Sequence, residues 1–282
     1  MKNLLFSVVA VVLLAGPVAA QTVASTPPVT RTELYELVLK DGSRVFGTIE
    51  SETDGEVVVR TQAGAVITAR RADVASLRLA SGRIERGEFL HSDRHRTRLF
   101  FAPTARSLKR GEVSFGVFQF IAPFVQVGVT DRISVGGGTP LLFGFEDWER
   151  PFWFTPKVQV VNTPNVQGAV GLLHVFDVSG DGAGIAYGVG TIGNSDNAFT
   201  GGAGLTYAGD SRGWVVMGGA EGRISRGMKL MTENYVWQNG EGIVSGGIRF
   251  LGDRLSADLA LAVPVGVGEF YAFPVINFVY VF

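Results

Sequence analysis

The residues best placed to do chemistry are charged side chains that interrupt otherwise apolar, alternating runs in the last two thirds of the chain. Asp258 precedes Leu259 and Arg249 precedes Phe250. Neighbours in a strand point to opposite faces, so charge would lie on one face and apolar bulk on the other. Both signs occur, which suits a wet or ion-paired barrel lumen. The candidates for lining that lumen are Lys157, Gln159, Glu221, Arg223, Lys229, Glu233, Arg249 and Asp258.

Catalysis by a nucleophile and a base needs an imidazole or its equivalent in contact with a hydroxyl or thiol. His174 is the only histidine beyond residue 95, and Leu172 and Phe176 share its strand face, which would aim it at lipid. Serines in this region are scattered and have no motif around them. We therefore expect no enzyme and assign no catalytic residue. The alternative is a lipid-modifying enzyme, because outer-membrane phospholipases use a His–Ser pair on the outer wall.

Metal and cofactor sites are weakly supported. His91, Asp93 and His95 form a minimal ligand set that nothing nearby completes, and the chain has no cysteine. The glycine clusters at 136–138 and 201–202 lack the Lys and Ser/Thr of a phosphate-binding loop. We expect no metal and no cofactor. A net charge of -1 and a pI of about 6.3 give no indication of nucleic-acid binding.

The first residues indicate export. In residues 1–20, Lys2 precedes an apolar run, Gly16 and Pro17 break it, and small residues end at Ala20, as in a signal peptide. Residues 21–31 are expected to form a linker. No later run is long enough for a membrane-spanning helix, and a chain without cysteine cannot carry a lipidated N-terminal Cys. A membrane-bound form must therefore be held by strands.

Residues 32–80 predict a small β domain. Short alternating runs are separated by turns such as Asp41-Gly42 and Ala63-Gly64. Leu39-Lys40-Asp41-Gly42, with Gly47 shortly after, resembles the start of an Sm-like strand pair, and the strand count also suits an SH3-like barrel. The signal peptide removes the segment from cellular RNA, so we expect a folding or docking module in the periplasm, with a periplasmic protein as its possible partner.

Residues 81–110 are rich in arginine and are expected to form a basic linker. Such a run can touch anionic lipid head groups, although a charge run is more often simply solvated.

Residues 111–282 alternate strand and turn to the end of the chain. The turn residues, such as Asn239-Gly240 and Gly252-Asp253, divide this region into about 12 strands. A soluble sandwich also alternates, but a charged face opposite an apolar face suits a transmembrane antiparallel β-barrel, with lipid outside. Glycines and alanines at 184, 186, 188 and 190 are expected to face inward.

The last strand carries aromatic side chains at alternate positions. Phe278, Tyr280 and Phe282 share one face, and the sequence ends at Phe282. This ending resembles the C-terminal strand of bacterial outer-membrane barrels, and the resemblance implies that these three residues form an assembly signal read by the barrel-assembly machinery.

Three segments resemble a family of uncharacterised bacterial proteins of the outer-membrane β-barrel type. They are Phe100–Glu112 (FFAPTARSLKRGE), Gly128–Gly138 (GVTDRISVGGG) and Thr155–Lys157 (TPK). The resemblance implies location and fold, and it carries no activity.

The sequence thus predicts an all-β chain with a barrel over 111–282 in the Gram-negative outer membrane, surrounded by outer-membrane lipid. We expect a narrow pore or transport protein. The alternatives are a structural barrel that tethers the periplasmic domain, the lipid-modifying enzyme, and a soluble secreted β protein. An open bore favours transport, and a plugged bore favours tethering. With a wet lumen, Leu259→Arg should cost more than Asp258→Arg.

Overall fold

The computed structural model describes residues 31–141, 151–176, 182–268 and 270–282. The predicted signal peptide and most of the 21–31 linker lie outside these residues. The chain divides into two compact units, residues 1–78 and 79–282, which are described separately.

The first unit is a five-stranded sheet with the order β4-β3-β2-β1-β5. Its strands are β1 (Arg31–Leu39), β2 (Arg44–Glu52), β3 (Glu56–Thr61), β4 (Val66–Arg70) and β5 (Val74–Leu79), and the 3-10 turn η1 (Arg71–Asp73) precedes β5. The predicted turn between β1 and β2 forms at Gly42, whose φ of +89° favours glycine. Leu37, Val57, Val59 and Ala69 form the core.

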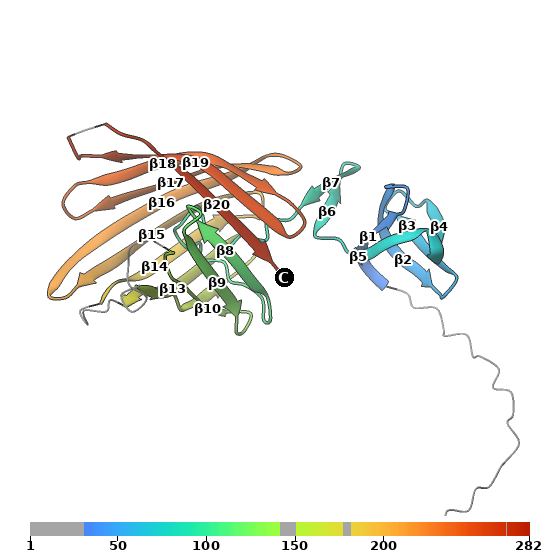
Figure 1. The fold of residues 1–282 in the computed structure, drawn as a ribbon, viewed down its shortest axis with the longest axis horizontal. Coiled ribbons are helices and arrows are strands. Elements are labelled where there is room, and N and C mark those ends of the chain that lie inside the picture. Colours follow the sequence, from blue (N-terminus) through green and yellow to red (C-terminus); the bar gives the residue numbers. More distant parts are fainter. Residues whose placement is uncertain (1–30, 142–150, 177–181, 269) are drawn as a thin grey trace, which may run out of the picture. The chain divides into compact units, whose positions relative to one another are not determined.

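The second unit is a closed antiparallel barrel preceded by a short hairpin (Figure 1). The hairpin consists of β6 (Gly82–Glu85) and β7 (Glu88–His91). The barrel strands are β8 (Val113–Phe118), β9 (Ala122–Gly128), β10 (Ile133–Gly138), β11 (Phe152–Phe154), β12 (Lys157–Asn162), β13 (Val166–Phe176), β14 (Ala183–Gly193), β15 (Asn197–Ala208), β16 (Ser211–Ser225), β17 (Met228–Trp237), β18 (Gly242–Leu251), β19 (Leu255–Val265) and β20 (Phe273–Val281).

The barrel has twelve strand positions, as the sequence predicts. Of its thirteen strands, β11 and β12 share the position between β10 and β13. Closure comes from the last strand, because β20 pairs with β8 with Tyr280 opposite Phe115. The all-β prediction of a small β unit followed by a barrel of about 12 strands is therefore confirmed.

Alternation along the strands places polar groups inside and apolar groups outside. Leu259 is 54% exposed, whereas its neighbour Asp258 is 2% exposed. A water-soluble barrel would show the opposite pattern, and an apolar outer wall is stable where lipid covers it. On β14 the expectation was wrong, because Ala186, Gly188 and Gly190 face outward, while Tyr187 and Val189 face inward.

In the part of the chain that the structure describes, no helix is long and apolar enough to cross a membrane.

Candidate functional site: the plugged barrel interior

Residues 92–112, here called the plug, fold back on themselves inside the barrel. The backbone N–H of Leu99 donates to the carbonyl of Ala102, and that of Thr104 donates to the carbonyl of Thr97, both at 2.9 Å. The apex of this turn is therefore at Phe100 and Phe101. Residues 81–110, expected to form a basic linker, instead supply the β6–β7 hairpin and most of the plug.

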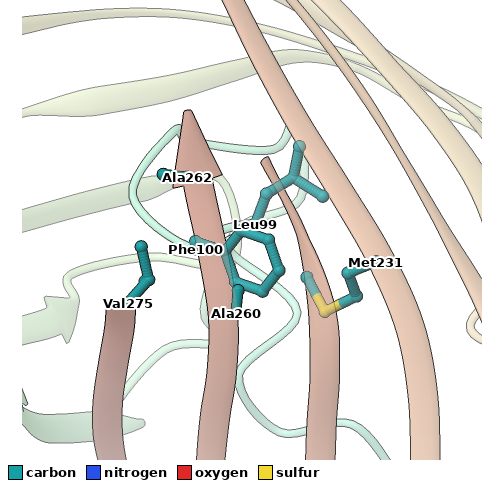
Figure 2. Close-up of a cluster of buried hydrophobic side chains, with 6 residues drawn as sticks. All are labelled: Leu99, Phe100, Met231, Ala260, Ala262 and Val275. Atoms are coloured by element: carbon teal, nitrogen blue, oxygen red, sulfur yellow. The ribbon is translucent and has the colours of Figure 1, made fainter. Parts of the chain in front are cut away.

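The apex packs on the inner wall of the barrel. Leu99 and Phe100 are fully buried against apolar side chains of β17, β19 and β20 (Figure 2). These wall residues are Met231, Ala260, Ala262 and Val275. Since several strands contribute to one cluster, apolar burial fixes the apex near the middle of the barrel.

A buried chain of alternating charges holds the part of the plug that precedes its apex. Lys229 Nζ on β17 donates to Asp93 at 2.8 Å and to Glu221 of β16 at 2.9 Å. Glu221 also accepts a hydrogen bond from Arg106, which follows the apex of the plug. Each charge has an opposite partner, which offsets the cost of removing it from water.

Arg249 of β18 makes the densest set of polar contacts with the plug. Its guanidinium pairs with Asp258 of β19 at 2.7 and 3.0 Å and reaches Asp93 at 3.3 Å. It also donates to the carbonyls of His95, Arg98 and Leu99. These contacts satisfy backbone groups that a non-helical segment would otherwise bury unpaired.

Glu233 and Asn277 bind the backbone at the apex. Glu233 accepts from the N–H groups of Phe101 and Ala102, at 3.0 and 3.1 Å, and from the Tyr235 hydroxyl at 2.6 Å. Asn277 Nδ2 donates to the carbonyl of Phe100 at 3.0 Å.

The opposite wall binds carbonyls of the plug on both sides of its apex, most of them after the apex. Lys157 Nζ on β12 donates to the carbonyls of Thr97, Thr104 and Arg106, at 3.3, 2.9 and 2.6 Å. Gln159 Nε2 donates to the carbonyl of Ala105 at 2.8 Å. The plug is thus bonded to the barrel wall on both sides.

Arg223 lies nearer the end of the barrel where the plug enters. It donates to Asp196, in the β14–β15 turn, at 2.6 Å and to the carbonyl of His91 at 2.8 Å. Arg83 of the hairpin also pairs with Asp196. Burial opposes ionisation, but the hydrogen bonds from Arg83 and Arg223 prevail and lower the pKa of Asp196.

The structure places all eight predicted lumen residues on the inner side of the barrel, and six of them form hydrogen bonds with the plug. Asp258 pairs with Arg249 and lies 3.9 Å from His95 of the plug. Arg223 binds the hairpin and the β14–β15 turn. The sequence reasoning missed the plug residues themselves, above all Asp93 and Arg106. A usable signal was present, because His95, Thr97 and Leu99 alternate with arginines and lead into an apolar stretch.

The side chains considered for a metal do not converge on one point. Asp93 binds Lys229, and His91 lies 3.1 Å from Asp253. His95 is buried 3.9 Å from Asp258, and neither of its ring nitrogens forms a hydrogen bond within the described residues. Among the described residues no group of three or more acidic, histidine or cysteine side chains is arranged to hold an ion.

The outer wall carries the other predicted residues. His174 Nδ1 lies 2.6 Å from the hydroxyl of Tyr207, and its ring meets Phe176 edge-on. Phe278, Tyr280 and Phe282 share the outward face of β20, with the rings of Tyr280 and Phe282 4.9 Å apart.

Comparisons with solved structures give outer-membrane barrels. The KdgM porin is 5% identical over 60% of this chain and 96% of its own, with a TM-score of 0.47. OmpT of Vibrio cholerae, in a loop-deleted form, is 11% identical over 90% and 97%, with a TM-score of 0.35. These scores are low, so the barrel is assigned from this chain's own strand pairing. No protein-family model and no curated protein matches the sequence.

Proposed function

We propose that the protein is an outer-membrane barrel closed by its own plug, which anchors the five-stranded N-terminal unit on the periplasmic side. The observation that supports this most strongly is the bonding of the plug to the wall, from Lys157 on one side to Arg249 on the other. A filled bore suits a tethering barrel better than an open pore.

The two ends of the barrel indicate its orientation. The end that holds the plug entrance and Phe282 has short turns, such as 163–165, 194–196 and 252–254. The widest gaps between successive barrel strands separate Gly138 from Phe152 and Val265 from Phe273, and these strand ends are at the other end of the barrel, here called the loop end. Outer-membrane barrels keep short turns in the periplasm, so the plug enters from that side. The N-terminal unit then has access to periplasmic partners.

Planar-bilayer conductance tests the closed state. The refolded mature protein should be silent, whereas a chain lacking residues 21–110 should conduct, because water fills the vacated interior. A matched control lacking residues 21–78 keeps the plug and should stay silent. Steady conductance of the intact chain would refute the anchor and favour a pore.

A second function, a gated pore, is favoured by the wall residues themselves. If the plug withdrew, Lys157, Glu221, Lys229 and Glu233 would line a mixed-charge path. Voltage-dependent openings of the intact chain that disappear after crosslinking the plug to the wall would support this alternative.

We propose no enzymatic activity. His174 is paired with Tyr207 on the lipid-facing wall, whereas two of the barrel serines, Ser134 and Ser245, are buried on the inner face. Phospholipase assays of the refolded protein, with His174→Ala as the control variant, test this proposal.

A further inference from the structure

The interior on the loop-end side of the plug holds a cavity that the plug does not fill. Its larger part has a volume of about 160 Å³ and is apolar. The side chains that shape it are Leu173, Ile185, Tyr187, Val215, Met217 and Tyr235. They come from the loop-end halves of β13, β14, β16 and β17, and Phe101 of the plug apex forms the floor.

A second, smaller cavity of about 60 Å³, here called the polar part, adjoins the first. The two parts share Phe101, Pro103, Leu173 and Tyr187. The polar part adds Thr97, Arg98, Gln126, Thr155 and Lys157, and none of the described residues that line it is a carboxylate.

Arg98 lines this second part of the cavity and has no ion-pair partner among the described residues. Its Nη1 donates to the carbonyl of Phe101 at 3.3 Å, and its guanidinium lies 5.3 and 5.8 Å from the ring centres of Phe124 and Phe118. Its buried Nε has no hydrogen-bond partner, and within the described residues it makes no ion pair. A buried N–H of a charged group that stays unpaired is costly.

A second polar group in the same cavity also lacks a partner. The Thr155 hydroxyl is buried, with the residue 8% exposed, and forms no hydrogen bond within the described part of the chain. By contrast, Gln126 is satisfied by Thr97 and Ser134, and Lys157 by three carbonyls. Arg98 and Thr155 therefore leave two donors free for an acceptor.

The charged residues of the interior indicate that a ligand in this cavity would carry a single negative charge. The ion-paired set is Asp93, Glu221, Asp258, Arg106, Lys229 and Arg249, and its charges cancel. Arg98 lies outside this set, and none of the described residues that line the cavity with it is a carboxylate. A ligand with one negative charge would neutralise Arg98 in a region of low dielectric constant.

We infer that this cavity binds a small apolar carboxylate, with the carboxylate on Arg98 and Thr155 and the apolar body against Leu173, Val215 and Met217. An apolar cavity of about 150 Å³ accommodates a benzene ring, so the body is about one aromatic ring in size. The ligand approaches from the loop end, because the plug blocks the other side.

The test uses the full mature chain refolded in detergent and two matched probes, 4-bromobenzoate and 4-bromobenzyl alcohol. Binding is measured by calorimetry, and the bromine is located by anomalous scattering from soaked crystals. We expect bromine beside Met217 and tighter binding of the carboxylate than of the alcohol.

Arg98→Gln should weaken carboxylate binding roughly tenfold or more, as expected for the loss of a charge-assisted hydrogen bond. Binding of the alcohol should be unchanged, which also shows that the variant is folded. The control Arg110→Gln, on the same plug but outside the cavity, should bind like the parent. Val215→Phe fills the apolar part and should abolish binding of both probes.

Equal binding of the two probes, equal binding by parent and Arg98→Gln, bromine on the outer wall alone, or binding at crystal concentration only would each overturn the inference.

Discussion

At the scale of single residues, Arg249 and Asp258 show how charge is tolerated at the depth of a bilayer. Both are buried, and they pair within hydrogen-bond distance. Removing one partner of a buried pair leaves an uncompensated charge, which costs about 3–5 kcal/mol. A substitution at Arg249 or Asp258 should therefore cost more stability than it would in a water-filled lumen.

Asp258→Arg should consequently destabilise the barrel more than Leu259→Arg, which reverses the expectation from sequence. In Asp258→Arg, the new guanidinium and that of Arg249 repel each other in a packed interior. In Leu259→Arg, the new arginine faces lipid near the middle of the bilayer, which costs about 2–4 kcal/mol. Urea unfolding of refolded barrels measures both variants, with Asp210→Arg at an exposed turn as the control. A milder effect of Asp258→Arg would show that water reaches this position.

Phe282 should matter more for assembly than for stability. The residue is 66% exposed, and its ring lies edge-on against that of Tyr280. If an insertion machinery reads this strand, deleting Phe282 should sharply lower the amount of heat-modifiable barrel recovered from cells. Refolding of the purified protein in detergent should change little. An equal loss in both assays would make Phe282 a packing residue.

At the scale of elements, the β6–β7 hairpin is fixed to the barrel end through Asp196. Asp196→Asn removes the charge that Arg83 and Arg223 share. Tryptic cleavage at Arg86, in the hairpin turn, should become faster while the barrel itself stays resistant. Asp210→Asn, on a turn at the other end, is the matched control, and unchanged cleavage would mean that backbone contacts alone hold the hairpin.

The same contact should be sensitive to acid. Since the pKa of Asp196 is lowered in the folded state, its contribution is complete above the ordinary value of 3.8 and is lost as the pH falls toward the folded pKa. Hydrogen exchange of residues 82–91, corrected for intrinsic rates, should therefore rise at acidic pH. The Asp196→Asn variant should lack this pH dependence.

At the scale of the whole molecule, the plug and the barrel form one compact unit, and the five-stranded sheet is a separate unit. The second unit begins at Leu79 and includes the hairpin and the plug. A chain with the signal peptide joined to residues 79–282 should insert and remain as resistant to heat as the parent. A chain starting at Val113 should be less stable, because Lys229, Glu233 and Arg249 lose their plug partners.

The orientation can be tested directly, because the chain has no cysteine of its own. With a membrane-impermeant maleimide, a cysteine at Asp210 should be labelled on intact cells. A cysteine at Thr53, in the N-terminal unit, should be labelled only after the outer membrane is permeabilised. The opposite pattern would reverse the proposed orientation.

The sequence by itself determined the strands, their two faces and their approximate number. Alternation has a period of two, and turn residues such as Asn239-Gly240 are local signals, so both can be read along the chain. The same two-residue period predicted that the side chains of Glu221, Lys229 and Arg249 face inward. The alternation does not predict which way small residues face, because the glycines and alanines of β14 fit either face of the wall.

Only the tertiary structure decided what fills the interior. The partners Asp93 and Lys229 are 136 positions apart, and Leu99 and Arg249 are 150 apart. No local pattern encodes such pairings, because residues 92–112 have neither a regular strand nor a helix to reveal where they lie. Their polar backbone could have been satisfied by water, and it is closure of the barrel around them that makes wall side chains their partners.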